Sequence, residues 1–231
     1  MKRAGILGVA TALLLAVEVT PAGAQFEGIV ESENLTVDES DAPQHFTMTI
    51  WVGNGMMRVH NTAIGTTPPS TIISRNDKAV LWVLNEEEKT YIEVLQNAEE
   101  KGTEQIPDAG PKPVLAKTAK KKKILGYTCN QYFLRRTGEV TEIWGTKQLP
   151  GLVRALSAMT QPEEGEAWTD ELSKIGVYPL SAKTKVDGNV VESQEVTKIE
   201  KKKIPAEMFE LPAGYRRDIV REGPDQRPEK M

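Results

Sequence analysis

The sequence predicts an α+β protein built on one antiparallel sheet, and three observations support this prediction. Short segments rich in β-branched and aromatic residues recur along the chain. Turn sequences such as Gly53-Asn54-Gly55 and Asp187-Gly188-Asn189 separate them, and Asn-Gly tolerates the positive φ angles of a hairpin turn. Between residues 150 and 176 the apolar period changes to the i, i+4, i+7 spacing of amphipathic helices. The pattern therefore indicates a run of hairpins interrupted by two short helices.

The strands are expected where apolar and polar residues alternate. They cover residues 26–37, 45–52, 56–62, 70–74, 78–84, 91–96, 120–136, 140–146, 178–186 and 190–204. In AVLWVL, residues 79–84, both faces are apolar, which predicts a strand that is covered on both sides. We expect the two helices to supply that cover.

The stretch from Lys120 to Thr146 holds the single cysteine of the chain. It is expected to form two strands joined by a turn at Thr137-Gly138-Glu139. Gly126 inside the first of these strands indicates a bulge or bend that lets the sheet curl. Cys129 has no partner for an internal disulfide, so we expect it to be buried and inert; a reactive thiol or an intermolecular bridge is the alternative.

The two expected helices have apolar stripes. Leu152, Leu156 and Met159 share one face of a helix that starts near Pro150-Gly151. Trp168, Leu172 and Ile175 repeat the spacing, and Gly176 follows where a C-terminal cap belongs. We expect both stripes to pack into the core. Farther along the chain, Phe209, Leu211 and Tyr215 are expected to anchor the C-terminal segment of the fold.

The N-terminus has the features of a signal peptide over residues 1–24. Lys2-Arg3 precede an apolar run at 4–17, and Ala22-Gly23-Ala24 form a cleavage site before Gln25. No cysteine follows the cleavage site, so a lipid anchor is not expected. The sequence therefore predicts an exported, soluble protein, which in a bacterium would be periplasmic.

The remaining chain is expected to form one domain over residues 25–217. Residues 97–119 are rich in Pro, Gly, Lys and Glu and lack periodicity, which predicts an exposed, mobile loop. Residues 218–231 are charged and aperiodic, which predicts a disordered tail.

The formal net charge of −4 argues against nucleic acid as the main partner. Two basic runs stand out nevertheless. They serve either solubility and protection of strand edges, or an electrostatic contact with anionic lipid headgroups or an acidic partner. The two runs would lie near each other if their strands paired. Their residues are Lys120, Lys121, Lys122, Lys123, Lys201, Lys202 and Lys203.

No motif for catalysis, a metal or a cofactor is recognised in the sequence. The two histidines, His45 and His60, are not expected to face each other if Asn54-Gly55 forms the turn between them. Glu86-Glu87-Glu88 and Glu163-Glu164 fall in expected turns, where carboxylates are solvated. We therefore expect no catalytic residues, no metal and no cofactor, and a protein that is not an enzyme.

Four segments together carry a resemblance to a known family. They are KKKILGYTCNQYFL, EIWGT, WTDELSKIGVYPL and VTKIEKKKIPAEMFELPAGY, and the match covers most of residues 26–217. The chain resembles an uncharacterised family of exported bacterial domains that is similar to the periplasmic lipoprotein carriers, the LolA-like fold. The resemblance implies a curled antiparallel sheet, or half-open β-barrel, with two short helices covering its concave face. It brings no catalytic residues.

Two functions are compatible with these observations. The first is a non-enzymatic periplasmic binding protein for a lipid, an acyl chain or a lipoprotein-like apolar ligand, with aromatic residues as candidate ligand contacts. The second is an interaction or structural module of the envelope, with a filled core and no ligand. The candidate ligand-binding residues are Trp51, Trp82, Tyr91, Trp144 and Trp168.

Overall fold

The computed structural model describes residues 26–37, 40, 42–96, 113–157 and 167–218. The expected signal peptide, residues 97–112 of the expected loop and residues 219–231 of the expected tail lie outside this part of the chain.

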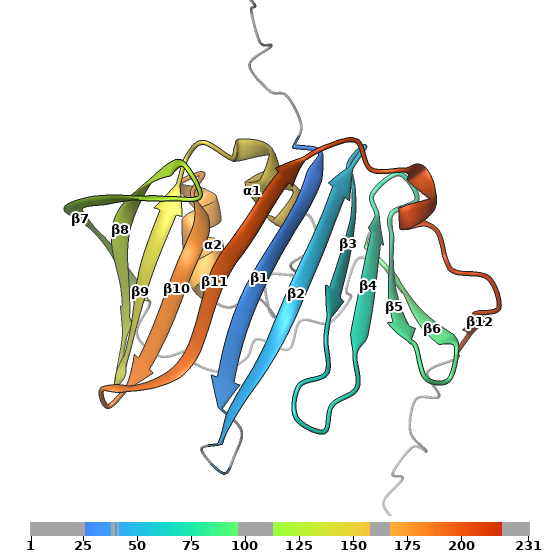
Figure 1. Cartoon of the computed structure of the whole chain (residues 1–231), viewed down its shortest axis with the longest axis horizontal. Coiled ribbons are helices and arrows are strands. Elements are labelled where there is room, and N and C mark those ends of the chain that lie inside the picture. The colour runs from blue at the N-terminus through green and yellow to red at the C-terminus, as the bar shows by residue number, and fades with distance from the viewer. Residues whose placement is uncertain (1–25, 38–39, 41, 97–112, 158–166, 219–231) are drawn as a thin grey trace, which may run out of the picture.

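Within the described residues one curled, unclosed sheet of twelve strands dominates the molecule (Figure 1). The strand order is β12-β6-β5-β4-β3-β2-β1-β11-β10-β9-β8-β7, and neighbours are antiparallel except for the parallel pair β12 and β6. The strands are β1 (Gly28–Val37), β2 (Pro43–Gly53), β3 (Met56–Asn61), β4 (Ser70–Arg75), β5 (Val80–Asn85), β6 (Thr90–Leu95), β7 (Val114–Ile124), β8 (Tyr127–Arg136), β9 (Glu139–Thr146), β10 (Tyr178–Val186), β11 (Asn189–Lys201) and β12 (Arg216–Arg217).

The predicted hairpin turns are present. Asn54 and Gly55 have φ angles of 52° and 74°, and Asp187 and Gly188 have φ angles of 50° and 86°. These positive values are those of a type I′ turn, whose twist matches that of the paired strands. The Asn-Gly and Asp-Gly pairs therefore fix the register of β2 with β3 and of β10 with β11.

The prediction for Gly126 is wrong. Gly126 and Leu125 form the turn between β7 and β8, with φ angles of 83° and 49°, so the expected strand at 120–136 is in fact two strands. The expected loop at 97–119 is also wrong from Val114 onward, because β7 begins there. β7 is an edge strand and needs no buried face, which is why its sequence lacks the alternation of apolar and polar residues that identifies other strands.

The two basic runs are not neighbours, because their strands do not pair. Lys120–Lys123 lie on β7 at one end of the strand order, where β7 pairs only with β8. Lys201 ends β11, where it is the partner of Gly28 in β1. Three strands, β8, β9 and β10, separate the two runs.

The cross-strand register divides the sheet into two faces. Tyr132, Ile143 and Ala182 are direct partners across β8, β9 and β10, and they form one buried cluster with Leu172. We call this side the helix face. Because side chains alternate along each strand, the register places Val30 and Ile50 on the helix face as well. The other side, the opposite face, carries the direct partners Ile73 and Trp82, together with Arg58, the direct partner of Ile73 on β3.

Two helices lie behind β9–β11 in Figure 1, and both contact β10. They are α1 (Pro150–Ser157) and α2 (Ala167–Lys174), as the apolar stripes predict. Leu152 of α1 and Leu172 of α2 are fully buried, as expected, whereas Ile175 of the second stripe follows the end of α2 and is exposed, contrary to the expectation. Met159 of the first stripe lies outside the described residues. Gly176 ends the second helix with a φ of 67°, and the Val177 amide donates to the Leu172 carbonyl at 3.0 Å, which confirms the predicted cap.

The helices do not supply the cover expected for residues 79–84. A C-terminal segment containing the 3-10 turn η1 (Ala206–Phe209) packs there instead. Phe209 and Ile204 are buried in one cluster with Trp82 and Ile73 of the opposite face. Leu211 and Tyr215 pack against the same cluster, as expected for anchors of the fold. The expected cover was wrong because this contact joins segments more than one hundred residues apart, which local spacing does not reveal.

Candidate functional site

A row of apolar side chains crosses the helix face from the centre of the sheet towards β6. Val30, Ile50 and Val59 continue directly into Ile72 of β4, Val83 of β5 and Ile92 of β6, each residue being the Cα partner of the next. A second row contains Leu81 and its partner Val94. The sheet thus presents a continuous apolar band on the face that also carries the helices.

The burial of this band falls towards β6. Val30 and Ile50 are buried, with 1% and 2% of their surface exposed, whereas Ile92 and Val94 are each 36% exposed. Between these ends the side chains are half-buried. The outer members belong to none of the buried clusters formed by the described residues. We call these outer members the apolar surface: Ile72, Leu81, Val83, Ile92 and Val94.

Three of the aromatic residues predicted to bind a ligand lie on the opposite face. Trp82 and Tyr91 meet edge to face, with ring centroids 6.4 Å apart. The Trp82 indole donates to a Glu93 carboxylate oxygen at 3.1 Å, and the Arg58 guanidinium lies 5.9 Å from the centre of the Trp51 ring. The sheet therefore brings Trp51, Trp82 and Tyr91 together, in contact with groups of the protein itself.

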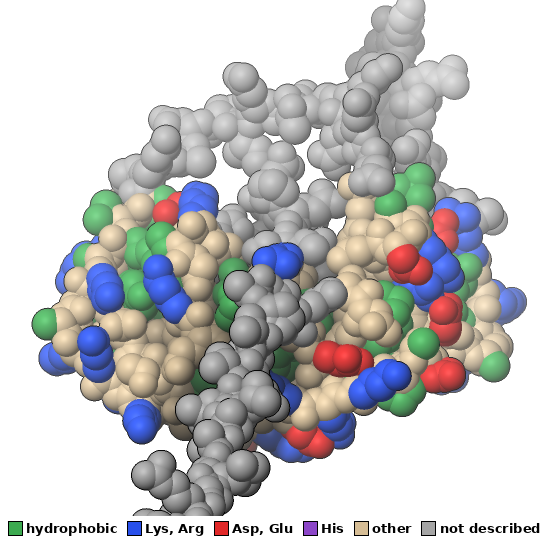
Figure 2. Space-filling model, turned by 90° about the horizontal axis from the view of Figure 1, so that it is seen from above, with side chains coloured by type: hydrophobic (Ala, Val, Ile, Leu, Met, Phe, Trp, Pro, Cys, Tyr) green, Lys and Arg blue, Asp and Glu red, His purple; other side chains and the backbone are tan. Residues whose placement is uncertain are grey.

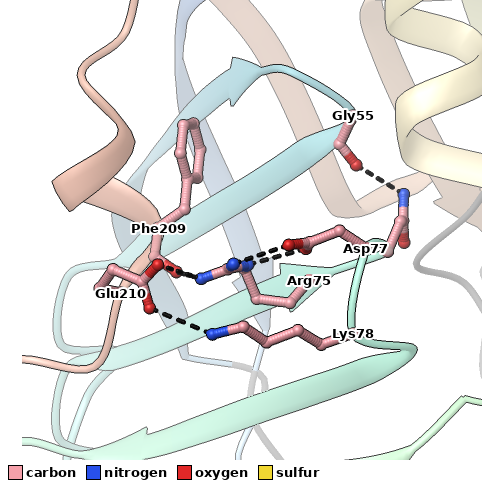
Figure 3. Close-up of polar contacts among 7 residues, drawn as sticks. Gly55, Arg75, Asp77, Lys78, Phe209 and Glu210 are labelled. Carbon is pink, nitrogen blue, oxygen red and sulfur yellow. Dashed lines mark hydrogen bonds and ion pairs between the residues drawn. The ribbon is translucent and has the colours of Figure 1, made fainter.

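Arg75 holds the C-terminal segment onto this cluster (Figure 3). Its side chain is buried and donates from Nε and Nη2 to the two carboxylate oxygens of Asp77, at 2.8 and 2.7 Å. Its Nη1 donates to the Phe209 carbonyl at 3.3 Å and pairs with the Glu210 carboxylate. Glu210 also accepts from Lys78 at 3.4 Å. We call this group the arginine clamp.

In the arginine clamp the carboxylates of Asp77 and Glu210 pair with the cations of Arg75 and Lys78. Hydrogen bonding to Arg75 is the main cause that lowers the pKa of both the Asp77 and the Glu210 carboxyl below the ordinary range. The same bonds raise the pKa of Arg75. Both carboxylates are half-exposed, so each contact contributes less than a buried pair would. The clamp positions Phe209 over the opposite face of the sheet, in one buried cluster with Ile73 and Trp82.

The other two predicted ligand contacts lie elsewhere. Trp144 is on β9, where its indole donates to Glu142 at 3.0 Å and the Lys122 ammonium lies 4.4 Å from its ring centre. Trp168 belongs to α2, and its side chain is outside the described part of the structure. As ligand contacts, all five aromatic residues stay predictions. The apolar surface was missed as a site, although its signal was present in the doubly apolar segment at residues 79–84 and in the alternate apolar residues Ile92 and Val94.

The polar side chains near His60 bond to one another. The Thr71 hydroxyl donates to Glu86 at 2.6 Å and lies 2.9 Å from His60 Nδ1. Thr71 is fully buried. His60 is the partner of Thr49 rather than of His45, as the predicted turn required. Among the residues that the structure describes, no group of three potential metal ligands occurs.

Cys129 is free and fully buried, which confirms its predicted burial. Removal from water raises the pKa of its thiol. The described helices include none that is long and apolar enough to cross a membrane.

The fold and its surfaces define a class of protein: one large curled sheet with an apolar surface on the face that carries its helices. Residues 26–215 match the family described as a domain of unknown function, DUF4412. The chain belongs to this family. A comparison with curated proteins finds no match.

Several solved structures are similar in outline. An uncharacterised conserved protein from Thermus thermophilus has a TM-score of 0.48 at 9% identity, covering 83% of this chain and 90% of that one. A LolA superfamily protein from Nitrosomonas europaea has a TM-score of 0.36 at 13% identity, covering 81% and 91%. MucB, in complex with MucA(peri), has a TM-score of 0.39 at 8% identity, covering 80% of this chain and 55% of MucB.

The family match confirms the expectation that the chain belongs to an uncharacterised family. At TM-scores below 0.5 the solved structures resemble this chain in outline alone.

Proposed function

We propose that this chain is an exported, soluble, non-enzymatic binding protein whose apolar surface takes an acyl chain or another apolar ligand of a lipid or lipoprotein. The observation that carries the proposal is the position of Ile92 and Val94. Both are 36% exposed on the helix face, next to half-buried Val83 and Leu81. Contiguous exposed apolar side chains on one face of a sheet are typical of an interaction site.

The size of the apolar surface suits an alkyl chain. Neighbouring strands lie about 4.8 Å apart, so the row from Val59 on β3 to Ile92 on β6 is roughly 14 Å long. Each methylene that the row removes from water contributes about 0.8 kcal/mol to binding. We also propose that α1 and α2 cover the concave side of the sheet next to this row, so that a bound chain would lie between the helices and β6.

Other parts of the proposal rest on the sequence. Export follows from the signal-peptide features of residues 1–24. The non-enzymatic character rests on the sequence, in which no catalytic motif is recognised. The polar groups of His60, Thr71 and Glu86 bond to one another, and the Thr71 hydroxyl is fully buried.

Native mass spectrometry of protein purified from its host tests the proposal. The double variant Ile92→Gln/Val94→Gln removes two apolar side chains of the apolar surface. The matched control is Val186→Gln/Val190→Gln, because these valines are each 37% exposed but lie on β10 and β11.

Wild type and control should carry the mass of a co-purified lipid, and the test variant should lose it. A clean apo mass for wild type under gentle conditions would overturn the proposal and favour the envelope module with a filled core. Equal lipid loading of both variants would overturn the assignment of the apolar surface.

A further inference from the structure

The hairpin of β7 and β8 is strongly basic, although the whole chain has a formal net charge of −4. Residues 113–138 contain seven basic and no acidic residues: Lys117, Lys120, Lys121, Lys122, Lys123, Arg135 and Arg136. All seven are exposed. In the described part of the chain none of them forms an ion pair. Figure 2 shows Lys and Arg side chains gathered on the left-hand lobe, the side on which β7 lies in Figure 1.

An exposed leucine occupies the turn of this hairpin. Leu125 has a φ of 49°, and 44% of its surface is exposed. Gly or Asn would adopt this left-handed conformation with little strain, whereas leucine adopts it at a cost in free energy. A Cβ atom added at Gly126 would meet no atom within 4 Å, so the space beside Gly126 is open, whereas the flanking Ile124 and Tyr127 pack against the core. Packing within the described residues does not account for a leucine here, because Leu125 belongs to no buried cluster.

Protection of a strand edge accounts for only part of the hairpin. β7 is the terminal strand, and its register shifts between Lys117 and Lys121. Lysines and irregular register both oppose the addition of another strand, so an extended peptide paired along β7 is not the favoured partner. Neither the lysines nor the irregular register requires an exposed, strained leucine at the tip.

We propose that the tip of the β7–β8 hairpin docks this protein on an anionic phospholipid surface. Lys121, Lys122 and Lys123 lie next to the lipid phosphates, and Leu125 inserts between the acyl chains. At about 3.4 Å per residue along a strand, Lys123 and Lys121 lie roughly 7 and 14 Å from the tip. Lys123 therefore lies within the Debye length of about 8–10 Å at physiological salt, and Lys121 lies within about twice that length, so the lysines act on the same surface as the inserted leucine.

This docking site is separate from the apolar surface. β7 lies at one end of the strand order, whereas β4–β6 lie near the other end. Failure of the docking experiment and failure of the lipid-loading experiment are therefore distinguishable.

Co-sedimentation of the protein with phospholipid vesicles tests the proposal. The test variant is Lys121→Gln/Lys122→Gln/Lys123→Gln. The matched control is Lys201→Gln/Lys202→Gln/Lys203→Gln, which removes the same charge from three exposed lysines near the middle of the strand order. Wild type should bind vesicles of phosphatidylcholine mixed with phosphatidylglycerol, and high salt should weaken that binding.

Each lysine near an anionic surface contributes about fivefold in affinity. The test variant should therefore bind about a hundredfold more weakly, and the control should bind like wild type. A second variant, Leu125→Asn, removes the inserted apolar side chain and places at this position a residue that adopts positive φ with little strain. It should weaken binding by about tenfold.

Three results would overturn the proposal. The first is an equal affinity of wild type for neutral and anionic vesicles, including no binding to either. The second is an equal loss of affinity in the two triple-lysine variants. The third is an affinity unchanged by Leu125→Asn, which would show that Leu125 does not insert and that the lysines alone bind the anionic surface.

Discussion

Replacing Phe209 by alanine should destabilise the protein by about 4 kcal/mol. The side chain is fully buried between the C-terminal segment and the opposite face of the sheet, in one cluster with Ile73 and Trp82. Its ring also lies 3.3 Å from the position that a Cβ atom would take at Gly53, so little space separates it from β2. Truncation of a buried phenylalanine loses its transfer free energy and leaves a cavity, which together cost about 3–5 kcal/mol.

Urea unfolding followed by tryptophan fluorescence measures this loss directly, because Trp82 lies in the cluster and Trp51 packs against it. The control is Glu207→Ala, an exposed position in the same turn, which should change stability by less than about 0.5 kcal/mol. A loss below about 1 kcal/mol in Phe209→Ala would refute the conclusion that the C-terminal segment is an integral cover of the sheet.

Four further outcomes follow from the structure. Hydrogen bonding to Arg75 lowers the pKa of the Glu210 carboxyl from its ordinary 4.5, so the stabilisation by Glu210 is complete above about pH 4.5 and is lost as the pH falls through the lower folded-state pKa. In that pH range the urea midpoint of wild type should fall more steeply with acidification than the midpoint of Glu210→Gln. Parallel pH profiles of the two proteins would contradict the clamp. Leu125→Asn should raise stability by about 1 kcal/mol in the same urea assay, because it relieves a left-handed leucine; a loss would show that this leucine packs. Cys129 should react with a thiol reagent only after unfolding, because it is buried and its pKa is raised; rapid labelling of the native protein would contradict this. Gly28→Ala should destabilise by about 1–3 kcal/mol in thermal unfolding, because its Cβ would lie 2.2 Å from a backbone oxygen of β11; an unchanged midpoint would contradict that contact.

The hairpins of the sheet could be predicted from local chemistry. Asn54-Gly55 and Asp187-Gly188 adopt the positive φ angles that their residue types favour. The two helices and the cap at Gly176 also followed from spacing alone. In each case the determinant lies within a few residues of the feature it fixes.

The errors arose where the determinant is distant or where a residue type is atypical. The tight turn between β7 and β8 was not predicted, because it contains Leu125 and leucine rarely adopts positive φ. Phe209 covers Trp82 from a distant part of the chain, so the doubly apolar strand was assigned to the wrong partner. The same strand contributes Leu81 and Val83 to the apolar surface. Its sequence correctly indicated two apolar faces but not which of them the protein itself covers.

The pairing of β1 with β11 has a consequence for how the chain folds. β1 to β6 form a series of neighbouring hairpins, and β7 to β11 form a second series in which the two helices connect β9 to β10. The seam between the two series is the pairing of β1 with β11. Local hairpins close quickly, whereas a seam between distant residues must first overcome the entropy of a long loop. We therefore expect each series to form early and the seam to set the folding rate. Because β1 pairs with β11, a nascent chain keeps its two halves unjoined until residues 189–201 have emerged.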